Sequence, residues 1–177
     1  MSAFDFEGRI VDIPDYPEPG VVFKDITPLF DDAEALRAVI DAIADHFADR
    51  GITKVVGAEA RGFMVGVPVA YRLGCGFVPA RKPGKLPREV YSQSYSLEYG
   101  TDELQIHQDA LSSDDHVLIV DDLIATGGTA IAAAKLAEQA GASVAGFGFI
   151  LELAFLNPRE IVAQECDQEV FTLVKVN

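Results

Sequence analysis

Residues 117–129 constrain the fold of this chain more than any other segment. Four apolar residues, 117–120, lead into Asp121 and Asp122, and the loop that follows contains Thr126-Gly127-Gly128-Thr129. A run that is apolar at every position suits an interior strand of a parallel sheet, because helices cover both of its faces. The alanine-rich stretch 129–140 then predicts a helix that ends at Gly141. The segment therefore predicts a buried strand, a glycine loop and a helix in succession.

The same alternation of strands and helices extends along the rest of the chain. Apolar residues recur at helical spacing over 32–50, with Asp31 or Asp32 as the N-cap and Gly51 at the end. Short apolar runs predict three further strands, at 54–57, 76–80 and 144–151. Alternating elements predict an α/β fold with a doubly wound, mainly parallel sheet. A length of 177 residues with 49% hydrophobic composition predicts one domain over residues 1–177.

Two segments do not fit this alternation, and we expect substrate contacts there. Four prolines exclude a long regular element from residues 13–30. Residues 82–108 are polar, aromatic and interrupted by glycine and proline, which predicts a long loop or a loose hairpin. Loops of this length often act as lids, so we interpret 82–108 as a flexible lid.

The charge of the chain excludes two classes of partner. The formal net charge is −14, whereas surfaces that hold nucleic acid or anionic lipid need extended positive patches. Basic residues do gather in one third of the chain, at Arg61, Arg81, Lys82, Lys85 and Arg88. This cluster is either a solvated basic loop or a local site for an anion.

Cysteine and histidine usage adds little chemistry. Cys75 and Cys166 are far apart and lack the spacing of a zinc site or a disulfide framework, so we interpret both as buried thiols. His46, His107 and His116 do not cluster with other metal-ligand types, and we assign none of them to catalysis. The acidic, proline-containing N-terminus is unlike a signal peptide, which predicts a cytoplasmic protein.

The loop after Asp121 and Asp122 suits a phosphorylated sugar. A glycine loop at a helix N-terminus presents backbone N–H groups to an anion, and the two acids can accept hydrogen bonds from vicinal hydroxyls. The loop lacks the lysine of a nucleoside-triphosphate loop and the spacing of a dinucleotide fingerprint. The alternative is that the acids and glycines only shape a turn.

The run 117–129 resembles the phosphoribosyl-pyrophosphate motif of type I phosphoribosyltransferases. Four further segments resemble signatures of the adenine-specific members of that family, in the family's order: 15–28 (DYPEPGVVFKDITP), 59–63 (EARGF), 81–87 (RKPGKLP) and 94–100 (SYSLEYG). The resemblance implies the type I phosphoribosyltransferase fold, with residues 1–30 as a small N-terminal hood that binds the base and residues 82–108 as the flexible lid. It also implies transfer of phosphoribose from 5-phosphoribosyl-1-pyrophosphate (PRPP) to N9 of adenine, giving AMP and pyrophosphate in purine salvage.

The resemblance also implies how the donor is held. PRPP and the phosphate of AMP would contact Asp121, Asp122, Ala125, Thr126, Gly127, Gly128 and Thr129. Pyrophosphate would contact Ala60, Arg61, Arg81 and Lys85, with a cis peptide at Glu59-Ala60, and Lys82 either joins them or stays solvated. Mg²⁺ would be carried mainly by PRPP, with no direct protein ligand. Because Arg81 and Lys85 match positions that reach a neighbouring subunit, the resemblance implies a homodimer.

The resemblance also implies four contacts to the base and three catalytic residues. Adenine would lie against Val22, Phe23 and Lys24, whose backbone reads its edge, and beneath Leu153, which could equally be a core leucine. Catalytic roles would fall to Arg61, Glu98 and Tyr99: Glu98 would stabilise or protonate the base and Tyr99 would close over the leaving group. Glu103 is the alternative acid.

Two other functions remain open at this point. The chain could transfer phosphoribose to another purine base, since the PRPP motif alone specifies only the superfamily. It could instead be a regulator that binds PRPP or a nucleotide without turnover. Turnover with adenine distinguishes all three.

Overall fold

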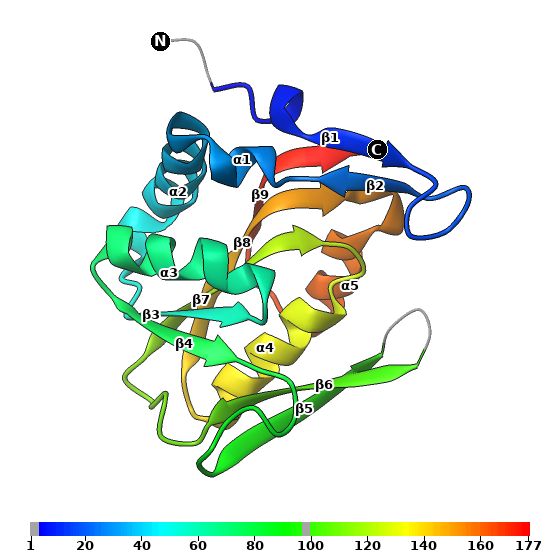
Figure 1. Cartoon of the computed structure of the whole chain (residues 1–177). Helices are drawn as coiled ribbons and strands as arrows, with labels where there is room; N and C mark the ends of the chain where they lie inside the picture. The colour runs from blue at the N-terminus through cyan, green and yellow to red at the C-terminus, as the bar shows by residue number, and fades with distance from the viewer. Residues whose placement is uncertain (1–3, 97–99) are drawn as a thin grey trace.

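A five-stranded parallel sheet forms the centre of the computed structural model, which describes residues 4–96 and 100–177 (Figure 1). Its strand order is β4-β3-β7-β8-β9, and every neighbouring pair is parallel. The strands are β3 (Lys54–Ala58), β4 (Gly76–Ala80), β7 (His116–Ile124), β8 (Ser143–Leu153) and β9 (Val170–Val176). The first four confirm the predicted strands, whereas β9 was not predicted.

Helices cover both faces of the sheet, which confirms the doubly wound α/β fold. One core contains α1 (Pro28–Asp31), α2 (Ala33–Phe47) and α3 (Arg61–Leu73), and the other contains α4 (Gly128–Gln139) and α5 (Pro158–Glu165). Strand β7 contributes Leu118 and Val120 to the first core and Val117 and Ile119 to the second. Because this strand lies between two helical layers, its side chains are buried on both faces, and every position of the run is therefore apolar.

The predicted helix over 32–50 is confirmed as α2 with a 3₁₀ turn, η2 (Ala48–Arg50), at its end. Asp32 is the N-cap, because its Oδ1 accepts a hydrogen bond from the amide of Ala35 at 2.8 Å. Gly51 ends the segment in the left-handed conformation at φ 66°, which a residue with a side chain rarely adopts. The helix of 129–140 is α4, which begins one residue earlier.

The strand order creates a switch point beside Asp121 and Asp122. The chain passes from β3 outward to β4, and then returns to place β7 on the other side of β3. In such sheets ligands bind outside the carboxyl ends of the strands where the order reverses. Strand β7 also runs farther than its apolar stretch, so both acids lie inside it, with Asp121 opposite Phe149 of β8.

Two small antiparallel sheets flank the main sheet. Near the N-terminus, β1 (Val11–Pro14) pairs with β2 (Val22–Asp25), preceded by a 3₁₀ turn, η1 (Glu7–Arg9). In the predicted lid segment, β5 (Val90–Ser96) pairs with β6 (Thr101–His107) as a hairpin. The last 3₁₀ turn is η3 (Ala154–Leu156), after β8. The short strands β1 and β2 agree with a proline-rich entry that forms no long element.

Two further sequence expectations bear on the chain as a whole. Cys166 is buried as expected, but Cys75 is only half-buried, because it lies in the turn between α3 and β4. Both are free thiols. Within residues 4–96 and 100–177, no helix is both long and apolar enough to cross a bilayer.

Candidate active site

The predicted phosphate loop lines a cavity of about 230 Å³ at the switch point. Gly127 precedes α4 in the left-handed conformation at φ 87°, which turns the chain from β7 into the helix. The first turn of α4 leaves backbone N–H groups without helical partners, and these groups favour an anion. All seven residues predicted for PRPP line this cavity: Asp121, Asp122, Ala125, Thr126, Gly127, Gly128 and Thr129.

Arg61 lies over the two acids from the first turn of α3. Its Nε is 2.8 Å from Oδ2 of Asp122, whose side chain is 4% exposed. The two atoms form an ion pair but no hydrogen bond, so Asp122 Oδ2 has no donor among the described residues. Buried carboxylate oxygens are normally hydrogen-bonded. Since this oxygen is fully buried beside Arg61, a ligand reaches it only when the Arg61 side chain moves away.

Burial changes the protonation of this acid pair. Enclosure in protein raises the pKa of Asp121 well above its ordinary value, and the neighbouring Asp122 carboxylate raises it further. Burial also raises the pKa of Asp122, although the Arg61 guanidinium partly opposes the effect. The pKa of Asp121 is therefore raised more strongly than that of Asp122, because Asp122 is paired with the Arg61 cation.

A close approach between α3 and β7 sets the position of Arg61. A side chain at Gly62 would place its Cβ 2.8 Å from Oδ1 of Asp121, so only glycine permits this packing. The preceding peptide, Glu59-Ala60, is cis, as the family resemblance implied. Glu59 Oε2 accepts a hydrogen bond from Nε of Arg81 at 2.6 Å, which ties the end of β4 to the loop that carries Arg61.

The other predicted pyrophosphate residues lie outside the cavity wall. Ala60 and Arg81 adjoin it through Arg61 and Glu59, and neither lines it. Lys85 is exposed in the loop after β4 and does not reach the cavity either. Lys82 forms an ion pair with Asp102 of the hairpin, so it is not simply solvated.

A second cavity of about 130 Å³ contains the four residues predicted for the base. Val22, Phe23 and Lys24 of β2 form one side, and Leu153 at the end of β8 lies on another. The ammonium of Lys24 is turned away to Oδ1 of Asp12, 2.7 Å distant on β1. Within the described chain, β2 pairs only with β1. The remaining edge of β2 therefore offers backbone groups to a ligand.

The two cavities meet at Arg61, Asp122 and Leu123, which line both of them. Sequence reasoning gave Leu123 no role, although it lies inside the predicted motif. Leu151 and Ile26 of the second cavity were also missed. The register that sets Leu123 opposite Leu151 depends on the extension of β7, which the apolar pattern did not indicate.

The predicted acid and base residues are only partly described. Glu98 and Tyr99 lie outside the described residues, between β5 and β6. Glu103, the alternative acid, lies on β6, where its Oε1 accepts a hydrogen bond from the Gln105 amide at 2.8 Å, and it lines neither cavity.

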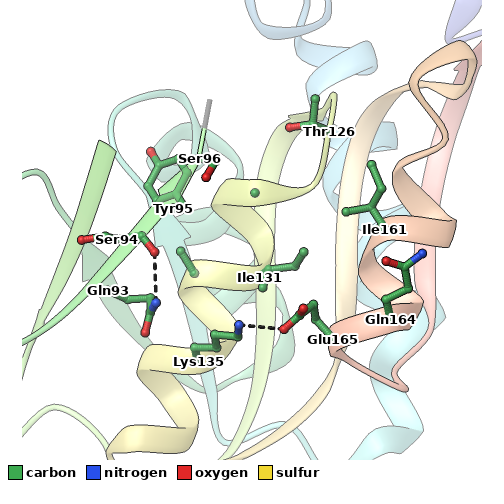
Figure 2. A pocket seen from close by; sticks show the side chains of 12 residues that line it. Gln93, Ser94, Tyr95, Ser96, Thr126, Ile131, Lys135, Ile161, Gln164 and Glu165 are labelled. Atoms are coloured by element: carbon green, nitrogen blue, oxygen red, sulfur yellow. Dashed lines mark hydrogen bonds and ion pairs between the residues drawn. The ribbon is translucent and has the colours of Figure 1, made fainter. Parts of the chain in front are cut away.

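A third cavity, of about 350 Å³, is lined by residues of the hairpin, α4 and α5 (Figure 2). Tyr95 and Ser96 of β5 lie beside the first turn of α4, and Ile161 faces them from α5. Lys135 closes its far end through a hydrogen bond of 2.7 Å to Glu165. The cavity reaches the phosphate loop at Thr126 and Gly128.

Comparison with known proteins identifies the family. A family model described as a phosphoribosyl transferase domain matches residues 26–174. The chain is 59% identical to the adenine phosphoribosyltransferase of Aeromonas salmonicida over 150 residues, which cover 85% of this chain and 83% of the relative. It is 51% identical to the enzyme of that name from Desulfitobacterium hafniense over 175 residues, 99% of each chain.

Solved structures agree with the sequence relatives. The adenine phosphoribosyltransferase of Thermoanaerobacter pseudethanolicus superposes with a TM-score of 0.91 at 47% identity, covering 97% of this chain and 98% of that one. The Giardia lamblia enzyme, solved with 9-deazaadenine, gives 0.92 at 39% identity over 100% and 99% of the two chains. With the two adjoining cavities at its switch point, the chain belongs to the adenine phosphoribosyltransferase family.

Proposed function

We propose that this protein transfers the phosphoribosyl group of PRPP to N9 of adenine, giving AMP and pyrophosphate. The observation that carries the proposal is the junction of two cavities at Arg61 and Asp122. One cavity has the loop and acids suited to a sugar phosphate, and the other has an apolar wall and a free strand edge suited to a base. A bond between sugar and base would form where they meet.

The donor's phosphate lies at Ala125 to Thr129 in this proposal, held by backbone N–H groups at the start of α4. The ribose hydroxyls lie over the acid pair. Asp122 accepts a hydrogen bond from one hydroxyl once Arg61 has turned from it toward the pyrophosphate. Asp121 lines the same cavity and contacts the neighbouring hydroxyl. The pair thus holds both neighbouring hydroxyls.

Adenine fills the smaller cavity, with its edge on the backbone of Val22 and Lys24. Phe23 and Leu153 supply apolar contact to the base. Because the Lys24 ammonium is engaged with Asp12, recognition falls to backbone groups. Backbone donors and acceptors distinguish the amino group of adenine from the carbonyl of other purines. The Giardia lamblia relative was solved with 9-deazaadenine, an adenine analogue.

Catalysis requires stabilisation of a cation-like ribose and of the departing pyrophosphate. Arg61 neutralises the leaving group beside Ala60 of the same subunit, and Arg81 and Lys85 reach the leaving group of the neighbouring subunit. Asp121 and Asp122 are carboxylates in the wall of the PRPP cavity, a hard oxygen donor type that suits Mg²⁺. Because Mg²⁺ keeps several waters and uses few protein ligands, the ion in this proposal would be held mainly by PRPP oxygens and water, and would add positive charge beside the leaving group.

Residues 82–108 act as the lid and residues 1–30 as the hood in this proposal. Glu98 stabilises the base at N7, and Tyr99 closes over the leaving group; both lie outside the described residues. Glu103 remains the alternative acid, but its place in the hairpin, hydrogen-bonded to Gln105, favours Glu98. We place the reaction in the cytoplasm, where free thiols such as Cys75 and Cys166 stay reduced.

We also propose that the active unit is a homodimer packed through α3. This helix exposes Met64, Val67 and Tyr71, with exposed fractions of 46%, 49% and 88%. Their spacing places them on one face of the helix, and exposed apolar patches of this kind mark protein interfaces. A dimer is also what the proposed reach of Arg81 and Lys85 into a neighbouring site requires.

The test is a steady-state assay with PRPP, Mg²⁺ and one of four bases: adenine, guanine, hypoxanthine or xanthine. We expect AMP and pyrophosphate in equal amounts with adenine, and a value of kcat/KM for the other bases lower by about 10³-fold or more. Turnover with another base only would assign a different specificity. PRPP binding without turnover of any base would instead indicate a regulator.

A further inference from the structure

The hairpin of β5 and β6 is joined to the rest of the molecule at two places. Near its base, Arg81 and Gln105 exchange two backbone hydrogen bonds of 2.8 Å and 2.7 Å, and Leu104 and Ile106 pack in the core beside α4. Toward its far end, the last strand pairs are Tyr95 with Asp102 and Ser96 with Thr101 (Figure 1).

Lys82 contacts both members of the pair formed by Tyr95 and Asp102. Its Nζ forms an ion pair with Asp102 Oδ2 and donates a hydrogen bond to the Tyr95 hydroxyl at 3.3 Å. The Tyr95 hydroxyl in turn donates to Asp102 Oδ2 at 3.2 Å. The other oxygen of Asp102 accepts from the amide of Glu103 at 2.8 Å. We call Lys82, Tyr95 and Asp102 the hairpin triad.

The hairpin triad also reaches the phosphate loop. A Cβ added to Gly128 would lie 3.4 Å from Cδ2 of Tyr95 and 3.0 Å from the carbonyl oxygen of Ser96. The tyrosine ring and the end of β5 therefore rest on the first residue of α4, as Figure 2 shows for Tyr95 and Ser96. The triad thus connects the loop after β4, the far end of the hairpin and the start of α4.

We propose that Lys82 is a positioning residue for the transfer reaction, acting through Asp102 and Tyr95. It fixes Ser96 and Thr101, the last pair of the hairpin, relative to the phosphate loop. Lys82 need not touch either substrate for this role. The inference rests on the proposed function, because positioning matters only if the site turns over.

The partial exposure of the triad favours positioning over a purely structural role. The side chains of Lys82 and Asp102 are 37% and 25% exposed, so the ion pair adds little to folding stability. The reaction rate is more sensitive than stability to the loss of this contact, because small displacements of reacting groups slow a reaction by large factors. Loss of the pair should therefore alter kcat much more than stability.

The experiment compares Lys82→Met, Asp102→Asn and Tyr95→Phe with the wild-type enzyme. We expect each to lower kcat by about tenfold and to leave the KM for PRPP within about twofold, since substrate contacts are unchanged. The double variant with Lys82→Met and Asp102→Asn should be no slower than either single variant, because both remove the same contact. Lys82→Arg, which keeps the charge, should recover most of kcat.

The matched control is Arg88→Met. It breaks another cation pair of the hairpin region, between Arg88 and Asp109, which lies at the hairpin base away from the phosphate loop. We expect kcat and KM within about twofold of wild type. Thermal melting of all variants separates loss of fold from loss of positioning, and we expect shifts of no more than a few degrees.

Two outcomes would overturn the inference. If Lys82→Met raises the KM for PRPP while Asp102→Asn and Tyr95→Phe behave as wild type, then Lys82 binds substrate directly. If all three variants match wild type, the triad has no role in the reaction. If the wild-type enzyme does not turn over adenine, the proposed function itself fails. The wild-type assay shows this before any variant is made.

Discussion

Arg61 Nε and Asp122 Oδ2 lie 2.8 Å apart without forming a hydrogen bond, at the one place where the two site cavities share their wall. The pair joins α3 to β7 across 61 positions of sequence. The Arg61 charge partly offsets the effect of burial, which raises the pKa of the Asp122 carboxyl. In the proposed reaction this contact separates, so that Arg61 meets the leaving group and Asp122 meets the ribose.

Replacing Arg61 with alanine should therefore remove most of the activity. We expect kcat to fall by about 100-fold or more, since a cation beside a departing anion contributes at that scale. Arg72→Ala is the control, because Arg72 pairs with Asp41 and Asp45 on the exposed side of the same helix. Equal losses in both variants would mean that the effect comes from α3 and not from the site.

Asp121→Asn should make the protein more stable, increasingly so as the pH rises. Burial raises the pKa of Asp121 in the folded state, so the folded protein binds more protons than the unfolded chain above the ordinary carboxyl pKa. Wild-type stability then falls with rising pH through that range, and a neutral amide removes this loss. Thermal melts from about pH 4 to about pH 8 should show a widening difference in Tm.

The exposed Asp114→Asn variant is the control for this measurement, and its Tm should follow the wild-type curve. A difference between Asp121→Asn and wild type that is constant over the whole pH range would contradict the assignment of the raised pKa to Asp121.

Gly127→Ala should weaken donor binding. The residue has φ 87°, and a new Cβ would lie 3.0 Å from Cγ2 of Val162, so the phosphate loop must shift. We expect the KM for PRPP to rise by about tenfold and the free energy of unfolding to fall by about 1–3 kcal/mol. Gly141→Ala has similar backbone strain at φ 89° beyond the other end of α4. Gly141→Ala should lower the stability without changing the KM for PRPP. An equal rise in KM in both variants would contradict the assignment of donor binding to the loop at Gly127.

Leu153→Ala should raise the KM for adenine by about tenfold, because it removes apolar contact from the wall of the base cavity. Lys24→Met should leave that KM within about twofold, since the ammonium is bonded to Asp12 and recognition is assigned to the backbone. Initial rates at saturating PRPP measure both. The opposite ranking would show that the lysine side chain reads the base.

Tyr71→Glu should dissociate the proposed homodimer. A carboxylate at the most exposed position of the α3 face would be buried against the partner. Phe155→Glu, which changes an aromatic side chain that is 59% exposed elsewhere on the surface, should leave the mass unchanged. Light scattering after size exclusion measures both. A monomeric wild-type protein would contradict the dimer.

Local sequence signals predicted the centre of the fold well. The apolar run 117–120 indicated a strand covered on both faces, and Val117 and Leu118 do pack into opposite cores. Asp32 and Gly51 marked the ends of a helix through capping and a left-handed turn. These signals depend on neighbours in the chain, so one sequence is enough to use them.

Contacts between distant segments were harder to predict. Strand β9 lies at the sheet edge with only Val170 and Val174 buried, so it lacks the continuous apolar run of an interior strand. The ion pairs of Arg61 with Asp122 and of Lys82 with Asp102 depend on how α3 and the hairpin dock. The family resemblance named many of the residues that line the two cavities, but their shared wall could be seen only in the structure.

A crystal structure of the protein with AMP tests most directly whether the two cavities form one site. We predict that the phosphate lies on the backbone N–H groups of residues 125–129 and the ribose hydroxyls on Asp121 and Asp122. The adenine ring should lie between Val22 to Lys24 and Leu153. AMP bound with its base in the phosphate loop, or in the cavity between the hairpin and α5, would contradict the account.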